Sequence, residues 1–183
     1  HTVRFRVAKL SKESGIPRYI LASSASIFGQ VEGIADENSE VFPLTAYSKA
    51  NRKAEIDNLA LNDEEFTVTA LRFSSLFGVS PRMRFDMAIN EMVLELYKTK
   101  KITVRGKTNQ RPFLHLKDAV NAYKLVLNAP KEKIADQIFN VGADEQNYKI
   151  GELAEEVAKS IDVNCTLELG DNKDHRSYFT SFK

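Results

Sequence analysis

The sequence predicts an α/β fold built on a parallel sheet. Residues 19–22 form a short apolar run that stops at hydroxyl side chains, and residues 66–73 are rich in β-branched and aromatic side chains, so both segments are predicted to be strands. Between them, Thr45 is placed to cap a helix that runs from residue 46 to about residue 61. A strand, a helix and a strand at this spacing favour a parallel pair with a right-handed crossover.

Hydrophobic periodicity predicts the remaining elements. Residues 30–42 are acidic and polar and are expected to form a loop. The other predicted helices lie at residues 1–14, 85–97 and 150–161, and residues 113–116 lead into a further helix that runs through about residue 127. The other predicted strands lie at residues 102–104, 138–141 and 166–169. The chain opens inside the first of these helices without a capping signal and ends abruptly on Ser-Phe-Lys after a strand-like run, so we expect it to be the middle of a longer protein.

The composition is that of an ordinary globular domain. The chain has 183 residues, of which 43% are hydrophobic and 28% charged, and its formal net charge is +1. This near neutrality gives no general attraction to nucleic acid or to an anionic membrane, and no apolar run approaches the length of a membrane span.

The single cysteine, Cys165, excludes an internal disulfide, leaves no metal-binding cysteine pair and is expected to be a small core residue. No secretion signal is recognisable, so a reducing, cytoplasmic location is expected.

Hydroxyl side chains mark a candidate active site. Ser23 and Ser24 follow the predicted strand at residues 19–22, at the carboxyl edge of the sheet, where open α/β folds bind ligands. Tyr47 stands near the start of the following helix, so Ser24 and Tyr47 could reach one another in space. Two hydroxyls placed in this way can pass a proton to or from a substrate alcohol. The alternative is that Tyr47 only packs at the start of the helix and that backbone groups satisfy Ser24.

Five motifs occur in a characteristic order along the chain. They are Ala-Ser-Ser-Ala-Ser-Ile-Phe-Gly at 22–29, Tyr-Ser-Lys-Ala-Asn at 47–51, Leu-Arg-Phe-Ser-Ser-Leu-Phe-Gly at 71–78, Arg-Pro-Phe-Leu-His-Leu-Lys-Asp at 111–118 and Phe-Asn-Val-Gly at 139–142. Each motif is weak alone, but together and in this order they are specific. With them, the chain resembles the extended short-chain dehydrogenase/reductase family, the NAD-dependent sugar epimerases and dehydratases.

The resemblance implies a partial Rossmann-type parallel sheet with a small α+β substrate lobe. Residues 1–78 and 113–142 would form the C-terminal part of a nucleotide-binding domain, and residues 79–112 and 143–183 would form the substrate lobe. Family members begin with a strand and a glycine-rich turn that cradles a dinucleotide, and this portion is absent from the sequence. The implied cofactor is NAD or NADP, which the chain as given is not expected to bind tightly. The helices that begin near residues 46 and 85 resemble those of the family's dimer-forming bundle, which implies a homodimer.

The resemblance also implies the roles of the two hydroxyls. Tyr47 would be the general acid/base that takes a proton from a sugar hydroxyl, and Ser24 would hydrogen-bond that hydroxyl. A tyrosine that works near neutral pH must ionise about three pH units below its model value, which corresponds to ~4 kcal/mol. In the family a lysine one helical turn later supplies a positive charge, and its attraction to the phenolate contributes roughly this much free energy. Here the position is Asn51, which can bind a ribose hydroxyl but carries no charge.

The implied cofactor-binding residues are Ser23, Asn51 and Ser74. At about 100° per residue, Asn51 shares the helix face of Tyr47, whereas Lys49 points to nearly the opposite side. The sequence therefore leaves open whether a neighbouring cation replaces the charge that Asn51 lacks.

Arginines are the implied substrate-binding residues. Arg111 matches an arginine that holds the substrate diphosphate, a task that suits a planar, permanently charged guanidinium, although a solvated loop arginine is the alternative. The family's second diphosphate arginine would fall near Asp171, which has the wrong sign, so Arg84 and Arg176 are the implied replacements. Ser75 stands where many relatives carry an asparagine beside the substrate or the cofactor.

Two further positions bear on the reaction. Dehydratases of this type place an Asp-Glu pair at the positions of Ala25 and Ser26 to move protons during the elimination of water, so a dehydratase activity is not expected. His115 precedes a helix in an apolar run without metal-ligand partners at useful spacing, so it is expected to be structural. No metal site is expected.

These residues lead to three hypotheses about function. The first is an NAD(P)-dependent nucleotide-sugar epimerase or related oxidoreductase, which transfers hydride at a sugar carbon with a Tyr/Ser proton relay. Asn51 and Asp171 motivate the second, a catalytically degenerate relative that binds a cofactor or a partner without turnover. The third is a simple reductase of a smaller carbonyl compound, whose turnover would not need the diphosphate.

Overall fold

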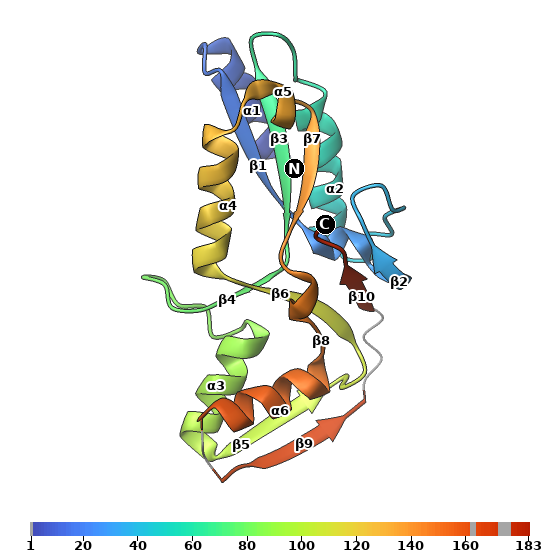
Figure 1. Ribbon diagram of the computed structural model, residues 1–183, viewed down its shortest axis with the longest axis vertical. Coiled ribbons are helices and arrows are strands. Elements are labelled where there is room, and N and C mark those ends of the chain that lie inside the picture. The colour runs from blue at the N-terminus through green and yellow to red at the C-terminus, as the bar shows by residue number, and fades with distance from the viewer. Residues whose placement is uncertain (1, 162–163, 172–176) are drawn as a thin grey trace.

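A three-stranded parallel sheet lies at the centre of the computed structural model, which describes residues 2–161, 164–171 and 177–183 (Figure 1). The strands, in spatial order, are β1 (Arg18–Ser24), β3 (Thr67–Phe73) and β7 (Gln137–Val141). Every residue of β3 is buried, as expected for the middle strand of a parallel sheet that is covered on both faces. The register places Phe73 beside both Ser24 and Val141, so the three strands end together at one edge.

Helices cover both faces of this sheet. They are α1 (Thr2–Glu13), α2 (Ala46–Leu59), α4 (Leu116–Asn128) and α5 (Lys131–Ile134). Figure 1 shows α2 and α4 on opposite sides of the strands. Ala70 of β3 shares an apolar cluster with Ala54 of α2, whereas Leu71 shares one with Ala119 of α4, because successive side chains of a strand point to opposite faces. These observations confirm the predicted α/β fold with a parallel sheet.

A second parallel pair lies where the sequence predicted a loop. β2 (Gln30–Ala35) pairs with β10 (Ser177–Thr180), and Ala35 lies beside Thr180. The prediction of a loop at residues 30–42 was therefore wrong over its first six residues. Most positions of β2 are exposed and one is Gly33, while the partner strand lies near the other end of the sequence. The segment therefore carries no local strand signal, and only a distant contact makes it a strand.

A smaller α+β unit lies below the central sheet in Figure 1. It comprises α3 (Ala88–Thr99), β5 (Lys101–Arg105), α6 (Ile150–Ile161) and β9 (Thr166–Gly170). β5 pairs in parallel with β9, and both helices pack on β5 around a core that includes Leu96, Ile102 and Leu153. This unit agrees with the predicted α+β lobe, whose boundaries stay a prediction. Within the described ranges, no helix combines the length and the apolar character that crossing a membrane requires.

Three short strands lie between the two parts. They are β4 (Ser75–Phe77), β6 (Gln110–His115) and β8 (Asn147–Lys149). β6 lies in the middle, parallel to β4 and antiparallel to β8. With three residues each, β4 and β8 are too short to show hydrophobic periodicity, which explains why the sequence did not predict them. This sheet carries two of the predicted substrate residues, Ser75 and Arg111.

A buried ion pair joins α2 to the central sheet. The Glu55 carboxylate of α2 is fully buried, and the Arg72 guanidinium of β3 bonds it with Nε–Oε1 and Nη2–Oε2 distances of 3.0 and 3.1 Å. Ser23 of β1 donates to the same carboxylate at 2.6 Å, and Arg52 of α2 donates to it at 3.1 Å. Two parallel bonds between a guanidinium and a carboxylate fix their relative orientation. One carboxylate therefore holds a helix against two neighbouring strands.

We predict that Arg72→Met lowers the free energy of unfolding by about 3–5 kcal/mol, because the Glu55 carboxylate would stay buried without its bidentate partner. Arg52→Met is the matched control. The Arg52 guanidinium bonds the same carboxylate, but its side chain is 35% exposed, so a loss of at most ~1 kcal/mol is expected. Urea unfolding followed by circular dichroism measures both losses. Equal losses for the two variants would contradict the dominant role of the Arg72–Glu55 pair.

Candidate active site

Ser24 stands where β1 ends, at the carboxyl edge of the sheet. Its hydroxyl caps the short 3₁₀ helix η1 (Ala25–Phe28), accepting from the Ser26 amide at 3.2 Å and donating to the Ser26 hydroxyl at 2.9 Å. A serine at this position satisfies an N–H group that has no partner within the helical turn. The Ser24 hydroxyl is therefore fixed at the sheet edge, in a hydrogen-bonded pair with a second hydroxyl.

Tyr47 is the second residue of α2, and the start of this helix is capped as the sequence predicts. Thr45 Oγ1 accepts from the Ser48 amide at 3.1 Å, and Ser48 Oγ accepts from the Thr45 amide at 2.9 Å, which makes a reciprocal capping box. α2 packs against η1, so the helix lies beside the segment that follows Ser24. The Tyr47 side chain is 58% exposed. Direct contact between the hydroxyls of Ser24 and Tyr47 stays a prediction.

A close approach at Gly29 fixes the path of the chain between Ser24 and Tyr47. Gly29 ends η1 with a φ of +70°, and the Phe42 amide donates to the Phe28 carbonyl at 3.4 Å. A Cβ atom at residue 29 would overlap the carbonyl oxygen of Phe42. A glycine is therefore needed both for the backbone conformation and for the contact with the segment that leads into α2.

Asn51 lies one helical turn after Tyr47. Both polar atoms of its side-chain amide form hydrogen bonds within the protein. Its Nδ2 donates to the Tyr47 carbonyl at 3.0 Å, and its Oδ1 accepts from Nη1 of Arg4. Asn51 is 1% exposed. Arg4 lies on α1, and the sequence interpretation missed it because the contact spans 47 positions and follows no local pattern. The binding of a cofactor by Asn51 stays a prediction, and Arg4 is the cation that the structure adds to this part of the site.

The other two predicted cofactor residues also donate hydrogen bonds within the protein. The Ser23 hydroxyl donates to Glu55 at 2.6 Å, and the Ser74 hydroxyl donates to the Val141 carbonyl at 2.9 Å. Both serines are buried next to the ends of their strands. Each hydroxyl oxygen can still accept a hydrogen bond, and its contact with the cofactor stays a prediction.

Arg111 lies on β6, in the small sheet whose first strand starts at Ser75. Its Nη1 donates to the Gln110 carbonyl at 3.0 Å, and its guanidinium carbon lies 5.1 Å from the centre of the Tyr178 ring. A guanidinium over an aromatic face has a defined orientation. Ser75 is half-buried and pairs in register with Phe113, two residues after Arg111 on β6. The structure thus brings these two predicted substrate residues into one sheet.

Arg84 lies in the exposed segment between β4 and α3. Its Nε and Nη2 donate to the Asp86 carboxylate at 3.1 and 2.6 Å. This hydrogen-bonded pair raises the pKa of the Arg84 guanidinium, with a smaller contribution from the negative charge of Tyr47 in its phenolate form, and it lowers the pKa of Asp86. The electrostatic interaction indicates that Arg84 lies near Tyr47. Arg176, the remaining predicted substrate residue, lies outside the described residues.

His115 is structural, as predicted. Its Nδ1 accepts from the Lys117 amide at 3.2 Å as the N-cap of α4, and its ring meets the Phe77 ring edge-on with a centroid distance of 5.3 Å. Among the residues that the structure describes, no cluster of three or more histidine, cysteine, aspartate or glutamate side chains could hold a metal ion.

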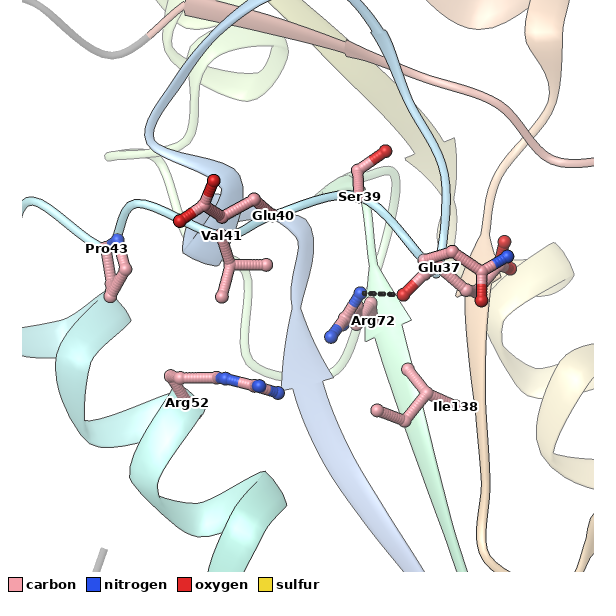
Figure 2. Close-up of a pocket in the computed structure, with 9 residues that line it drawn as sticks. Glu37, Ser39, Glu40, Val41, Pro43, Arg52, Arg72 and Ile138 are labelled. Carbon is pink, nitrogen blue, oxygen red and sulfur yellow. Dashed lines mark hydrogen bonds between the residues drawn. The ribbon is translucent and has the colours of Figure 1, made fainter.

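Two hollows of the surface lie away from the candidate catalytic residues. Figure 2 shows a hollow of about 610 Å³ whose lining includes Glu37, Arg52, Arg72 and Ile138, with a hydrogen bond from Arg72 to the Glu37 carbonyl. A second, apolar hollow of about 370 Å³ lies between α3 and the segment at residues 77–85. Neither lining includes Ser24 or Tyr47.

The parallel sheet with helices on both faces is the arrangement of a Rossmann-type fold, and comparison with known proteins identifies the family. Residues 1–142 match the NAD dependent epimerase/dehydratase family, so the chain belongs to this family and the predicted resemblance is confirmed. A curated relative is the uncharacterized UDP-glucose epimerase YtcB of Bacillus subtilis (strain 168). The two are 26% identical over 157 residues, which cover 84% of this chain and 48% of that protein. The chain thus spans about half the length of the curated relative.

Solved structures share the fold. MoeE5 in complex with UDP-glucuronic acid and NAD is 25% identical, with a TM-score of 0.84, and the match covers 98% of this chain and 60% of that one. The UDP-glucuronic acid 4-epimerase of Bacillus cereus, in complex with UDP-glucuronic acid and NAD, is 19% identical, with a TM-score of 0.85, and the match covers 99% and 58%. These matches confirm the predicted partial Rossmann-type fold.

The family is NAD-dependent, and the residues at the sheet edge fit one end of a dinucleotide. Ser24, Ser74 and Gly142 stand at or just after the ends of the three central strands. A Cβ atom at Gly142 would lie within 2.4 Å of the Phe182 ring and 2.6 Å from Ser74 Oγ, so an aromatic ring and a hydroxyl both lie against bare backbone at this edge. Hydroxyls beside bare backbone suit a ribose or an amide. The sequence given contains no glycine-rich turn of the kind that cradles a pyrophosphate.

We predict that Gly29→Ala destabilises the protein more than Gly33→Ala does. Both glycines have positive φ, +70° and +86°, which costs a substituted residue about 1–3 kcal/mol. Only at Gly29 would the added Cβ also meet backbone, because nothing lies within 4 Å of a Cβ at Gly33. Urea unfolding of both variants measures the difference, and amide hydrogen exchange should report loosening near Phe42 in Gly29→Ala alone. Equal losses would show that the Gly29–Phe42 approach does not constrain the site.

Proposed function

We propose that the complete protein is an NAD-dependent nucleotide-sugar epimerase that transfers hydride at a sugar carbon, with Ser24 and Tyr47 as its proton-handling pair. The observation that carries the proposal is the placement of Ser24 at the carboxyl edge of the sheet, linked through Gly29 and Phe42 to the capped helix of Tyr47, in a chain of this family. Because the chain spans about half of its curated relative, the activity is proposed for the whole protein.

In this proposal the two hydroxyls manage one proton. As the substrate alcohol becomes a ketone, its hydroxyl proton passes to the Tyr47 phenolate. The Ser24 hydroxyl, already paired with Ser26, turns toward the same substrate oxygen and holds it in position. When the ketone is reduced on its other face, Tyr47 returns the proton and the configuration at the carbon is inverted. NAD, when bound, supplies the reversible acceptance of the hydride.

The residues after Ser24 favour epimerisation over dehydration. Eliminating water requires an acid and a base beside the sugar, and carboxyl groups are the usual source. Ala25 is fully buried and has no polar side chain. The hydroxyl and the amide of Ser26 both form hydrogen bonds with the Ser24 hydroxyl. Neither residue can take the place of a carboxylate pair.

The proposed substrate is a UDP-sugar, held through its diphosphate. Arg111 has the fixed guanidinium that such a contact needs, and Arg84 and Arg176 are the further proposed cations. MoeE5 and the Bacillus cereus epimerase were solved with UDP-glucuronic acid, and the Bacillus subtilis relative is described as a UDP-glucose epimerase. The diphosphate distinguishes this proposal from a simple reductase, whose turnover would not depend on Arg111.

We also propose that the complete protein is a cytoplasmic homodimer. The outer side of α1 supports the dimer, because Val3, Val7 and Leu10 are 73%, 48% and 60% exposed and recur at the spacing of a single helical stripe. An exposed apolar stripe on a helix is a common surface for pairing with a second copy.

A degenerate relative is the alternative, and Asn51 is the observation that favours it. Asn51 is uncharged at a position one helical turn after the proposed base. If the wild-type protein is silent with NAD and UDP-sugars but Asn51→Lys turns them over, the alternative is supported and the first proposal fails.

The proposed role of Tyr47 leads to a direct prediction. Tyr47→Phe in the complete protein should lower kcat by about 10²–10⁴-fold, because the proton on the substrate hydroxyl would have no acceptor. Tyr97→Phe is the matched control: Tyr97 lies on α3, is 77% exposed and should leave kcat unchanged. Nuclear magnetic resonance of UDP-glucose or UDP-glucuronic acid with NAD follows the appearance of the epimer. Undiminished turnover by Tyr47→Phe would overturn the assignment.

A further inference from the structure

We propose that Arg4 is a positioning residue of the active site, which supplies through Asn51 the positive charge and the hydrogen-bond donors beside Tyr47. The inference rests on the proposed function, because Tyr47 needs a nearby positive charge only if it acts as a base. It goes beyond that function by assigning the charge to α1, a helix that contributes no other site residue.

The geometry forms a short chain of contacts from α1 to α2. Arg4 Nη1 donates to Asn51 Oδ1, and Asn51 Nδ2 donates to the Tyr47 carbonyl at 3.0 Å. Tyr47 and Asn51 stand four residues apart on α2, so their side chains leave the helix on the same face. Asn51 is 1% exposed and Arg4 is half-buried, so the contact between them is partly shielded from solvent. The guanidinium of Arg4 is thereby attached to the face of α2 from which the Tyr47 side chain projects.

The chemistry assigns the free donors to Arg4 rather than to Asn51. Asn51 uses its amide nitrogen on the Tyr47 carbonyl and its amide oxygen on Arg4. A guanidinium has five N–H donors and is permanently charged. Among the residues that the structure describes, the Arg4 side chain donates only to Asn51, so it keeps donors for a ribose or another oxygen-rich group. Asn51 then acts as a clamp that orients Arg4.

Of the described cations near the Tyr47 face of α2, Arg4 is the one without a carboxylate partner. On the segment before α3, Arg84 is neutralised by Asp86 at 2.6 Å. On α2, Arg52 pairs with Glu55 and Lys53 pairs with Asp57, while Lys49 is exposed and points to the other side of the helix. Arg4 forms no ion pair with any described residue.

The charge of Arg4 already acts on a second phenol nearby. Tyr19 of β1 donates to the Arg4 carbonyl at 3.4 Å. Burial raises the pKa of Tyr19, and the charge of Arg4 lowers it in part. The charge of Arg4 therefore favours the ionised form of a phenol beside α1. The variants below test whether it does the same for Tyr47 on the adjacent helix.

The test compares three variants of the complete protein. Arg4→Gln keeps hydrogen-bonding ability but removes the charge, Arg4→Lys keeps the charge, and Arg6→Gln removes an exposed charge from the same helix as the matched control. The pH dependence of kcat is the measurement, because a purely structural role would not displace it. Arg4→Gln should displace the active range to higher pH by about one unit and lower kcat at neutral pH about tenfold, whereas Arg4→Lys should keep most of the wild-type profile and Arg6→Gln all of it.

A charge at residue 51 provides the decisive rescue. In the double variant Arg4→Gln, Asn51→Lys, the profile should return toward that of the wild type, because a lysine there restores a cation on the face of Tyr47. An unchanged profile in Arg4→Gln, or a displaced profile that Asn51→Lys does not restore, would overturn the proposal.

A second readout separates this inference from the proposed function. The ultraviolet absorbance of phenolate, taken as the difference between each variant and its Tyr47→Phe counterpart, reports the titration of Tyr47 without any turnover. If no protein in the series turns over UDP-sugars, the proposed function fails, but the difference titration still decides on Arg4. A displacement to higher pH in Arg4→Gln alone supports the inference, and identical titrations of Arg4→Gln and Arg6→Gln contradict it.

Discussion

The buried carboxylate of Glu55 is the contact on which the candidate site depends. It lies two helical turns after Tyr47 on α2, and it bonds Ser23 of β1 and Arg72 of β3. Ser23 immediately precedes Ser24, and Arg72 immediately precedes the last residue of β3. One charged group thus sets the helix of Tyr47 against the two strands whose ends form the site edge. A buried carboxylate persists only when its partners are in place, so the network tolerates little displacement of α2.

Local contacts then bring the chain from one hydroxyl to the other. Ser24 caps η1, Gly29 ends it against Phe42, and Thr45 starts α2. These contacts involve backbone N–H and C=O groups with fixed partners, so they constrain the path more than side-chain packing alone would. On the same face of α2, one helical turn before Glu55, Asn51 joins this helix to Arg4 of α1. The site is therefore a helix held against both a sheet and a second helix, with its tyrosine near the N-terminal end of the helix.

The sequence predicted the parts that local chemistry determines. The buried strand at residues 66–73 and the capped helix from residue 46 follow from side-chain type and spacing, and both are present. The pairing of β2 with β10 was missed, because each strand is short and the two lie at opposite ends of the chain. Such a pairing leaves no periodic trace in either segment.

The same limit applies to the charge beside Tyr47. Sequence reasoning could compare only residues that share a helix with Tyr47, and it left open whether any cation replaces the charge that Asn51 lacks. Arg4 stands in no motif with Asn51, and the contact exists only because α1 packs on α2. The pattern of residues does not predict which helices, distant in sequence, pack against each other. Electrostatics at an active site depends on such contacts as much as on the motif itself.

The most direct test of the account is a crystal structure of the complete protein with NAD and a UDP-sugar. The account predicts that Tyr47 Oη and Ser24 Oγ both lie within hydrogen-bond distance, about 2.6–3.2 Å, of one sugar hydroxyl. A sugar bound elsewhere, or bound at this edge with Tyr47 still turned to solvent, would contradict the claim that these two hydroxyls form the reaction centre.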